Sequence, residues 1–410
     1  MAALDHVALT HPDTATDAAL RVLFVSHTYV VGINQGKLNA IAPASSQSSS
    51  LQSIAPAITV GLLAPSNWKS LEWNRTLPLE SPYPQLKIYA APVALTGRGG
   101  AHFYAPWRVW QVLRDFQPHL IQVEEEVFSL CALEFAIWSR LTQMPLVFFG
   151  WENQARSLPL LRRWIRQFVL STASLVIAGN HDGADLLHQW GYRGLIEVMP
   201  QMGVDPELFH PITAPAVEPD PPEFRIGYLG RLVPEKGIDT LLTALHQLRS
   251  QSLNCRLILC GSGSSETALK KIAQDQRISE WVTWQGAIPH HQAPSVMSQF
   301  DVLVLPSRTT PTWKEQFGHV LIEAMAMGIP VIGSDSGEIP NVIGRPDLIF
   351  PEDNALALTR ILQDLIENPA WRTKIQQYCL LRVQQHYTHD RIAQKLMTLW
   401  RKILRQGGNL

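Results

Sequence analysis

Short apolar runs alternate with segments of helical periodicity through most of the chain. Runs of this length and composition predict strands that are buried on both faces of a sheet. In the first half of the chain, the predicted strands are Arg21–Ser26, Ile58–Ala64, Leu86–Ala90, Leu120–Val123, Leu146–Phe149 and Leu175–Ala178. Between them, apolar residues recur at helical spacing over Pro106–Phe116, Ser129–Leu141 and Leu158–Leu170. Alternating strands and helices are typical of an α/β domain with a parallel sheet.

A second series of the same kind follows a stretch that is rich in proline. The prolines are Pro211, Pro215, Pro219, Pro221 and Pro222. This composition is typical of a stiff linker, so we place a domain boundary there. The strands predicted beyond it are Phe224–Gly230, Arg256–Gly261, Val282–Gly286, Val302–Pro306 and Pro330–Gly333. We therefore predict the α/β fold class, with two Rossmann-like doubly wound domains, 21–212 and 213–389, that face a central cleft.

Three segments lie outside this alternation. Residues 1–20 lack the basic start and apolar centre of a signal peptide, and we expect them to form an N-terminal extension. The serine-rich window Pro43–Ala57 is too polar to span a membrane and is interpreted as a low-complexity loop insertion. The last helix, within about 390–410, carries Ile392, Leu396, Leu399, Trp400 and Ile403 on one face. We expect this apolar face to pack back on the first domain.

The net charge and the cysteine spacing exclude some classes of protein. The formal net charge of −1 over 410 residues gives no basic footprint, so we expect no nucleic-acid partner. The four cysteines include no C-x-x-C pair, which indicates neither a disulfide framework nor a zinc site. We expect a reducing, cytoplasmic setting.

Two glutamates flank a predicted junction between a loop and a helix. Glu315 and Glu323 stand on either side of Gly318, where the helix is expected to begin. The free N–H groups at a helix start favour a phosphate, so Glu323 would reach a ribose diol and Glu315 would face a sugar. The alternative is that both are solvated surface acids.

A pair of cations follows the first strand of the second series. After Gly230, Arg231 and Lys236 flank a turn that leads into a helix. Two cations at this spacing can bracket a diphosphate and neutralise the charge of a leaving group. The alternative is an ordinary basic loop.

Taken together, these motifs resemble the retaining family 4 glycosyltransferases of the GT-B fold. The resemblance covers the chain from about Arg21 to its end and is more specific in the second half. The matching elements are Gly230-Arg231 with Lys236-Gly237, Cys260 to Gly263, Gly286 to Ile288, Pro306-Ser307, Glu315 with Glu323, and Gly203 to Asp205 with Phe209.

The resemblance implies a role for each matching residue. Arg231 and Lys236 would bind the diphosphate of the donor, Glu323 its ribose and Glu315 its sugar. Backbone groups near Ile288 would hold the base. The residues that would supply amides to the phosphates and the hexose are Phe317, Gly318, His319 and Val320. The donor would be a UDP-, GDP- or ADP-sugar, and since the chain has no D-x-D motif, we expect no cofactor and no essential metal.

The first half departs from the family pattern in two places. A loop with single glycines, Val31–Lys37, replaces the usual Gly-Gly loop, although Gly32 still allows a close backbone approach to a diphosphate. The acids Glu124, Glu125 and Glu126 stand where many members have a His-x-His segment. One of them, Glu124 in the first place, would orient or deprotonate an acceptor hydroxyl. Alternatively, the acids only begin the next helix.

One further segment has the character of a membrane surface. Residues 156–168 combine four arginines with Trp164, Phe168 and several leucines. They would either dock on anionic lipid or form a helix with one core face and one solvated basic face. Docking would favour a lipid-linked acceptor and a peripheral position on the inner face of a membrane.

The sequence thus predicts a metal-independent glycosyltransferase. It would move a hexosyl-type group from a nucleotide sugar to a saccharide or lipid-linked acceptor, with retention, in exopolysaccharide or cell-envelope glycan synthesis. No placed nucleophile is evident, which favours front-face attack over double displacement. The alternatives are a GT-B phosphorylase or epimerase, and a non-catalytic protein that binds sugar nucleotides or acts in assembly.

Overall fold

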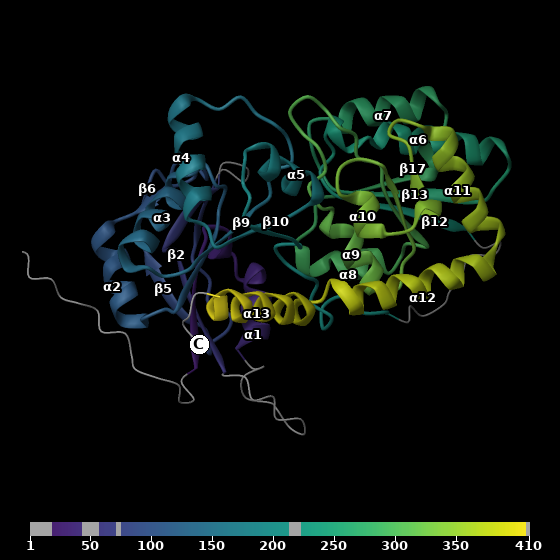
Figure 1. The fold of residues 1–410 in the computed structure, drawn as a ribbon. Helices are drawn as coiled ribbons and strands as arrows, with labels where there is room; N and C mark the ends of the chain where they lie inside the picture. Colours follow the sequence, from purple (N-terminus) through teal and green to yellow (C-terminus); the bar gives the residue numbers. More distant parts are fainter. Residues whose placement is uncertain (1–18, 43–56, 71–74, 213–222, 407–410) are drawn as a thin grey trace, which may run out of the picture.

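The computed structural model describes residues 19–42, 57–70, 75–212 and 223–406. It contains two α/β domains, each built on a parallel sheet that is covered by helices on both faces (Figure 1). The predicted fold class is confirmed. The predictions for the N-terminal extension, the serine-rich loop and most of the linker prolines fall on residues 1–18, 43–56 and 213–222, outside the described residues.

The N-terminal domain is built on a seven-stranded parallel sheet in the order β11-β10-β9-β8-β1-β2-β5. Its strands are β1 (Leu20–Val25), β2 (Ile58–Pro65), β5 (Lys87–Ala91), β8 (Leu120–Glu124), β9 (Leu146–Gly150), β10 (Leu175–Ala178) and β11 (Leu195–Val198). Strand β1 lies inside the sheet, where Leu23 pairs with Gly61 of β2 on one side and with Ile121 of β8 on the other. Every strand predicted for this half is present. The edge strand β11 was missed because its residues are only half-buried and include Glu197.

Helices cover both faces of this sheet. They are α1 (Gly36–Ile41), α2 (Pro106–Phe116), α3 (Leu130–Thr142), α4 (Leu160–Thr172) and α5 (His181–Gln189). Helix α2 has the predicted bounds, since Pro106 is preorganised for a first helical turn. Helix α3 begins where the Ser129 hydroxyl accepts a hydrogen bond from the Ala132 amide. Two antiparallel hairpins outside the sheet were not predicted: β3 (Asn67–Ser70) with β4 (Arg75–Pro78), and β6 (Val93–Ala94) with β7 (Phe103–Tyr104).

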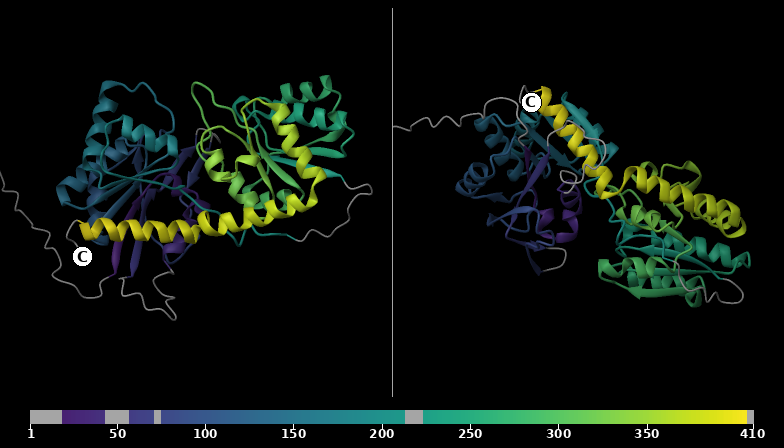
Figure 2. Two further views of the ribbon diagram at one scale, coloured as in Figure 1. Left: turned by 45° about the vertical axis from the view of Figure 1, so that its right-hand side comes forward. Right: turned by 90° about the horizontal axis from the view of Figure 1, so that it is seen from below.

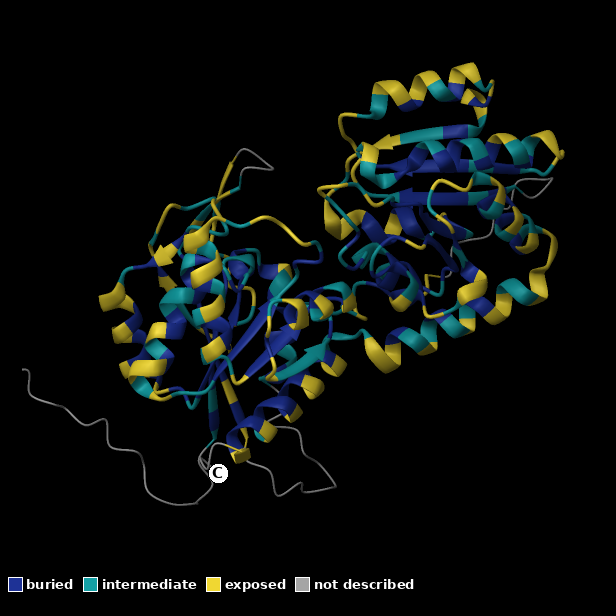
Figure 3. Ribbon diagram, turned by 45° about the horizontal axis from the view of Figure 1, so that its top comes forward, coloured by how far each residue is buried: buried dark blue, intermediate teal, exposed yellow. Residues whose placement is uncertain are grey.

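The C-terminal domain repeats the plan with a six-stranded sheet in the order β14-β13-β12-β15-β16-β17. Its strands are β12 (Phe224–Leu229), β13 (Cys255–Cys260), β14 (Val282–Gly286), β15 (Val302–Leu305), β16 (Val331–Ser334) and β17 (Ile349–Phe350). Its helices are α6 (Ile238–Ser250), α7 (Glu266–Asp275), α8 (Ala293–Met297), α9 (His319–Ala326), α10 (Ile339–Ile343), α11 (Ala355–Glu367) and α12 (Pro369–His386). In both domains the sheet is buried between partly exposed helices (Figure 3).

The last two helices bridge the domains. Helix α12 lies on the C-terminal domain, and α13 (His389–Gln406) runs back along the N-terminal domain (Figure 2). The apolar face of α13 packs into the core of that domain with Phe24 and Leu38. Within this core, the Trp400 indole N–H donates to the Gln122 side-chain oxygen at 2.8 Å. The C-terminal helix is therefore an integral part of the N-terminal domain.

Candidate functional site: the strand ends of the C-terminal domain

Lys236 and Glu315 form an ion pair at the carboxyl end of the second sheet. The Lys236 Nζ lies 2.5 Å from the Glu315 Oε2, and the two side chains are only 13% and 9% exposed. The Ser307 hydroxyl donates to the same carboxylate oxygen at 2.8 Å. The Lys236 Nζ also lies 4.8 Å from the centroid of the Trp313 ring. The pair is thus desolvated and held by both a hydroxyl and an aromatic ring.

The topology of the sheet explains why these two side chains meet. Lys236 follows β12 in a 3-10 turn (Pro234–Lys236), and Glu315 lies in the loop that follows β15. Strand β12 has β13 on one side and β15 on the other, so chain order reverses between β12 and β15. Ligands of doubly wound sheets bind at such a switch point, in the crevice beyond the carboxyl ends of the strands.

Helix α9 begins next to this pair. Gly318 precedes it with a φ of +83°, and a Cβ atom there would lie 2.9 Å from the Leu305 side chain, so the position requires glycine. The first turn of a helix leaves N–H groups without intrahelical partners, and the helix dipole favours an anion there. Of the residues in this turn, His319 packs against the Phe317 ring at 4.9 Å, and desolvation lowers its pKa. Val320 packs against the domain core.

Glu323 lies one turn further along α9 and bonds a histidine that the sequence did not single out. The His290 Nε2 is 2.9 Å from the Glu323 Oε1, and this hydrogen bond raises the pKa of His290. His290 begins a short 3-10 turn, His290–Gln292, just after Ile288, which packs against the domain core. The structure therefore brings the residues predicted for the ribose and for the base to one side of the domain.

Arg231 lies on the same loop as Lys236 but is more exposed. Its side chain is 52% exposed, and its guanidinium is 3.9 Å from Glu235. Gly230, before it, lies so close to Gly261 that a Cβ atom on Gly261 would meet the Gly230 carbonyl. The close backbone contact fixes the start of the loop, while the Arg231 side chain stays in solvent.

The N-terminal domain contacts the loop that carries Glu315. The Asn153 side-chain amide donates to the carbonyls of Lys314 and Glu315, both at 3.2 Å. Lys314 also lies 3.1 Å from Asp182, and His181 bonds Glu338 at 2.7 Å. Sequence spacing gave no signal for these partners, because Asn153, His181 and Asp182 belong to the other domain.

The structure places Glu124 inside the N-terminal domain. It is fully buried and forms an ion pair with Lys37 at 2.6 Å. It also accepts hydrogen bonds from Tyr29 at 2.6 Å, from Gln122 at 2.8 Å and from Gln201 at 3.1 Å. An acceptor-side role needs an exposed carboxylate oxygen, and Glu124 has none.

Its two neighbours also have partners, and Glu125 is buried while Glu126 is partly buried. Glu126 accepts from the amides of Trp151 and Glu152, and burial raises its pKa to about 8. Glu125 bonds His27. The acids do not begin the next helix either, since α3 starts at Leu130.

Gly32 is likewise engaged within its own domain. Its amide donates to the Glu80 carboxylate at 2.6 Å. A Cβ atom at this position would lie 2.9 Å from both Glu80 and Pro82. A diphosphate could approach this backbone only by displacing the Glu80 carboxylate.

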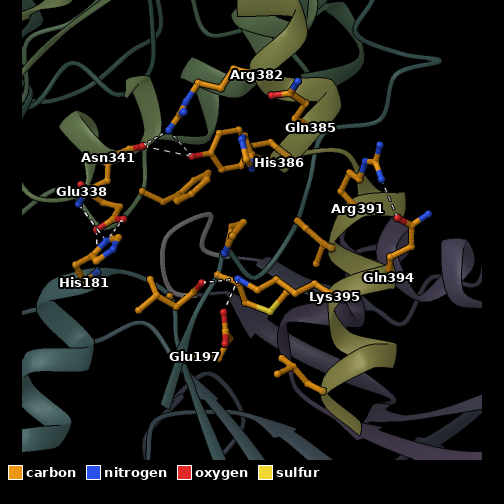
Figure 4. Close-up of a pocket in the computed structure, with 18 of the residues that line it drawn as sticks. His181, Glu197, Glu338, Asn341, Arg382, Gln385, His386, Arg391, Gln394 and Lys395 are labelled. Carbon is orange, nitrogen blue, oxygen red and sulfur yellow. Dashed lines mark hydrogen bonds and ion pairs between the residues drawn. The ribbon is translucent and has the colours of Figure 1, made fainter. Parts of the chain in front are cut away.

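A cavity of about 670 Å³ lies between the domains beside the α12–α13 junction (Figure 4). It is lined by His181 and Glu197 from the N-terminal domain, by Glu338 and Asn341, and by polar residues of α12 and α13. Some of its ionic groups are paired, as in the contact of 2.6 Å between Lys395 and Glu197. Lys236, Glu315 and Glu323 do not line it. We therefore assign the candidate donor site to the strand ends and not to this cavity.

The C-terminal half of the chain matches a known family. Residues 213–380 match the family model described as "Glycosyl transferases group 1". The structure thus has the GT-B fold, and its C-terminal half matches the glycosyl transferases group 1 family. Within the part of the chain that the structure describes, no helix is long and apolar enough to cross a membrane.

Curated relatives match part of the chain. The chain is 31% identical over 202 residues to a GDP-mannose-dependent alpha-(1-6)-phosphatidylinositol monomannoside mannosyltransferase of Mycobacterium tuberculosis, covering 47% of this chain and 51% of that protein. It is 31% identical over 167 residues to the putative colanic acid biosynthesis glycosyltransferase WcaL of Escherichia coli, covering 40% of each. The chain therefore spans about half the length, or less, of the curated relatives it matches.

Solved structures match nearly the whole chain in fold. Anabaena HepE in complex with UDP gives a TM-score of 0.68 at 19% identity, covering 93% of this chain and 100% of that one. Sucrose-phosphate synthase from Thermosynechococcus elongatus gives a TM-score of 0.67 at 21% identity. The match covers 94% of this chain and 100% of that one. At this identity the likeness establishes the GT-B fold.

Proposed function

We propose that the chain is a glycosyltransferase that moves a hexosyl group from a nucleoside-diphosphate sugar to a saccharide or lipid-linked acceptor, with retention of anomeric configuration. The observation that carries the proposal is the desolvated pair Lys236–Glu315 at the switch point of the matched domain. A cation and a carboxylate at one point suit a substrate with an anionic diphosphate next to a sugar.

Donor binding would rearrange this pair. The diphosphate would draw Lys236 away from Glu315 and would lie against the start of α9, with Arg231 closing over it from solvent. Glu315 would then accept hydrogen bonds from sugar hydroxyls. Glu323 would leave His290 for the ribose diol, and backbone groups near Ile288 would hold the base.

The same groups suit the charges of the transition state. The sugar becomes cationic as its bond to phosphate breaks, and Glu315 would stabilise that charge. Arg231, Lys236 and the start of α9 would stabilise the anionic leaving group, so we propose that no metal is essential for the step. Front-face attack, assisted by the leaving phosphate, accounts for retention without a protein nucleophile.

We also propose that the N-terminal domain docks on the cytoplasmic face of a membrane, which would favour a lipid-linked acceptor. On α4, Leu160, Leu161 and Trp164 are 80%, 65% and 57% exposed, while Ile165 and Val169 form a core face. The Trp164 and Phe168 rings stack at 5.6 Å. Arg163 is exposed among them. An exposed apolar cluster with an aromatic ring and a cation suits the interface of an anionic bilayer.

The relatives guide the choice of substrates to test. One acts, by its name, on a phosphatidylinositol mannoside with GDP-mannose, another belongs to colanic acid biosynthesis, and solved neighbours hold UDP or UDP-glucose. We propose a role in exopolysaccharide or cell-envelope glycan synthesis.

A donor screen tests the proposal. Thermal unfolding is measured with UDP-, GDP- and ADP-sugars, because a ligand that binds the folded state raises its stability. The stabilising donor is then incubated with saccharide and lipid-linked acceptors, and the anomeric configuration of the product is read by NMR. Transfer with retention supports the proposal. Stabilisation without turnover favours a non-catalytic binding protein, and turnover with inorganic phosphate as acceptor favours a phosphorylase.

A further inference from the structure

Three side chains from separate segments converge beyond the ends of β1 and β8 in the N-terminal domain. They are His27, His102 and Glu125, and one ligand atom from each lies within 4.8 Å of the others. The His27 Nδ1 is 2.5 Å from the Glu125 Oε1, and the His102 Nε2 is 3.5 Å from the same oxygen. His102 and Glu125 are buried, and His27 is 15% exposed.

His102 holds a lone pair toward the carboxylate. Its Nδ1 lies 3.0 Å from the Gly99 carbonyl, which can only accept, so this nitrogen carries the proton. In a neutral ring, the proton on Nδ1 leaves Nε2 with a free lone pair. The Nε2 is then an acceptor, it is buried, and it has no hydrogen-bond partner among the described residues. The Glu125 Oε1 already accepts from the His27 amide at 3.1 Å and bonds the His27 ring, so the interaction left unmade is that of the His102 Nε2, which a cation would supply.

We propose that His27, His102 and Glu125 form a binding site for a zinc-class divalent transition metal. Two imidazoles and one carboxylate are a known zinc ligand set that leaves a fourth position open. Zinc bonds of about 2.0–2.2 Å place tetrahedral ligand atoms about 3.4 Å apart, close to the spacing between His102 and Glu125. Imidazole ligands favour zinc, cobalt, nickel or copper over magnesium or calcium.

The surroundings suit a metal ligand set. The N–H of His102 is fixed by the Gly99 carbonyl, the outer contact that orients a ligating histidine. The Trp68 ring lies over His27 at 4.4 Å and beside His102 at 5.0 Å, which shields the cluster from solvent. To bind, the metal would displace the proton shared by His27 and Glu125, and their nitrogen and oxygen would move apart by about 1 Å to reach tetrahedral spacing.

A metal here would cross-link three parts of the N-terminal domain: the segment after β1, the loop between β6 and β7, and the segment after β8. These segments lie at the carboxyl edge of the first sheet and are distinct from the strand-end site of the C-terminal domain. The proposed metal would therefore cross-link the N-terminal domain at a place separate from the proposed donor site.

The test is metal binding by the whole chain after treatment with a chelator. Calorimetric titration with Zn²⁺ is expected to show one saturable equivalent and Mg²⁺ none, and Zn²⁺ is expected to raise the melting temperature. Co²⁺ is expected to give the visible absorption of a low-coordinate imidazole complex. His27→Gln and His102→Gln are each expected to weaken Zn²⁺ binding by at least about 10-fold, the lower end of what loss of an outer-shell partner costs.

His188→Gln serves as the matched control, because His188 is exposed on α5 outside the cluster. Circular dichroism checks that each variant is folded, and the partly exposed His27 decides the matter if the His102 variant fails to fold. Absence of saturable Zn²⁺ binding, or unchanged affinity in the folded His27 variant, would overturn the proposal. The experiment measures metal binding and not sugar transfer. A negative result would therefore not contradict the proposed glycosyltransferase activity.

Discussion

The Lys236 ammonium and the Glu315 carboxylate, 79 residues apart in sequence, lie 2.5 Å apart where the order of the second sheet reverses. Removal of one partner leaves the other desolvated and unpaired, which costs more than loss of both. We expect Lys236→Met to lower the free energy of unfolding, and the double variant with Glu315→Gln to recover part of the loss. Urea unfolding of the single and double variants measures this coupling, and strictly additive losses would contradict it.

Glu315 should matter most in the transition state. We expect Glu315→Gln to lower kcat by about 100-fold, the effect of losing one strong electrostatic contact at a reacting centre, with a smaller change in donor affinity. Steady-state kinetics with the donor found by the screen checks this. An unchanged kcat would remove Glu315 from the site. Glu280→Gln, in a turn that follows α7, is the matched control.

Arg231 should act on the donor more than on the fold, because its side chain is half exposed and its ionic partner is distant. We expect Arg231→Ala to leave the melting temperature of the free protein nearly unchanged and to abolish most of the donor-induced shift. Lys271→Ala on α7 removes an exposed cation outside the site and should behave as wild type. A full donor shift in the Arg231 variant would contradict its role at the diphosphate.

The contact between His290 and Glu323 predicts a pH dependence. Glu323 raises the pKa of His290 above its usual value of about 6.5. This contact therefore adds stability that is complete below that value and is lost as pH rises through the raised pKa. Above it, neutral His290 holds Glu323 less tightly, so donor affinity should increase. His290→Gln should flatten the pH dependence of stability, measured by thermal unfolding, and that of donor affinity, measured by donor titration. An unchanged pH dependence would contradict the role of the contact between His290 and Glu323.

Trp400 should anchor the C-terminal helix to the N-terminal domain. Its side chain is fully buried, and its indole donates to Gln122, which in turn donates to Glu124. We expect Trp400→Ala to cost about 3–5 kcal/mol of unfolding free energy, as for other large core truncations. Leu381→Ala, at an exposed position of α12, is the control and should change stability little.

The exposed cluster on α4 gives a prediction for membranes. Replacement of Leu161 and Trp164 by serine should reduce sedimentation with anionic vesicles while leaving the fold intact, because both side chains are exposed. Leu356→Ser, at an exposed apolar position of the C-terminal domain, is the control. Equal sedimentation of the wild type, the Leu161 and Trp164 double variant and the Leu356 control would exclude α4 as the docking surface.

The sequence predicted those helices and strands that are marked by a local pattern of apolar residues. Helix α2 has the bounds that were predicted, because Pro106 and the apolar spacing both mark its start. The strands before Lys236 and Glu315 were predicted from their apolar runs. The edge strand β11 was missed since Glu197 interrupts its apolar character. Local pattern thus suffices where burial is continuous along an element.

Long-range pairing was beyond the sequence. The sequence suggested that Glu124 acts on the acceptor or begins a helix, but its partner Lys37 lies 87 residues away, and the two neutralise each other in the core. His290 gave no sign of meeting Glu323, and His102 lies in a loop without any periodic pattern. Tertiary packing alone brings these groups together, so spacing along the chain does not reveal them.

The most direct test of the central assignment is the donor dissociation constant of the wild type and of Lys236→Ala, measured by calorimetry at one salt concentration. If Lys236 binds the donor diphosphate, the variant should bind the donor about 10- to 100-fold more weakly, as expected for loss of a charged hydrogen bond. The free nucleoside without phosphates should bind both proteins alike. Equal donor affinity for the two proteins would contradict the assignment of the site.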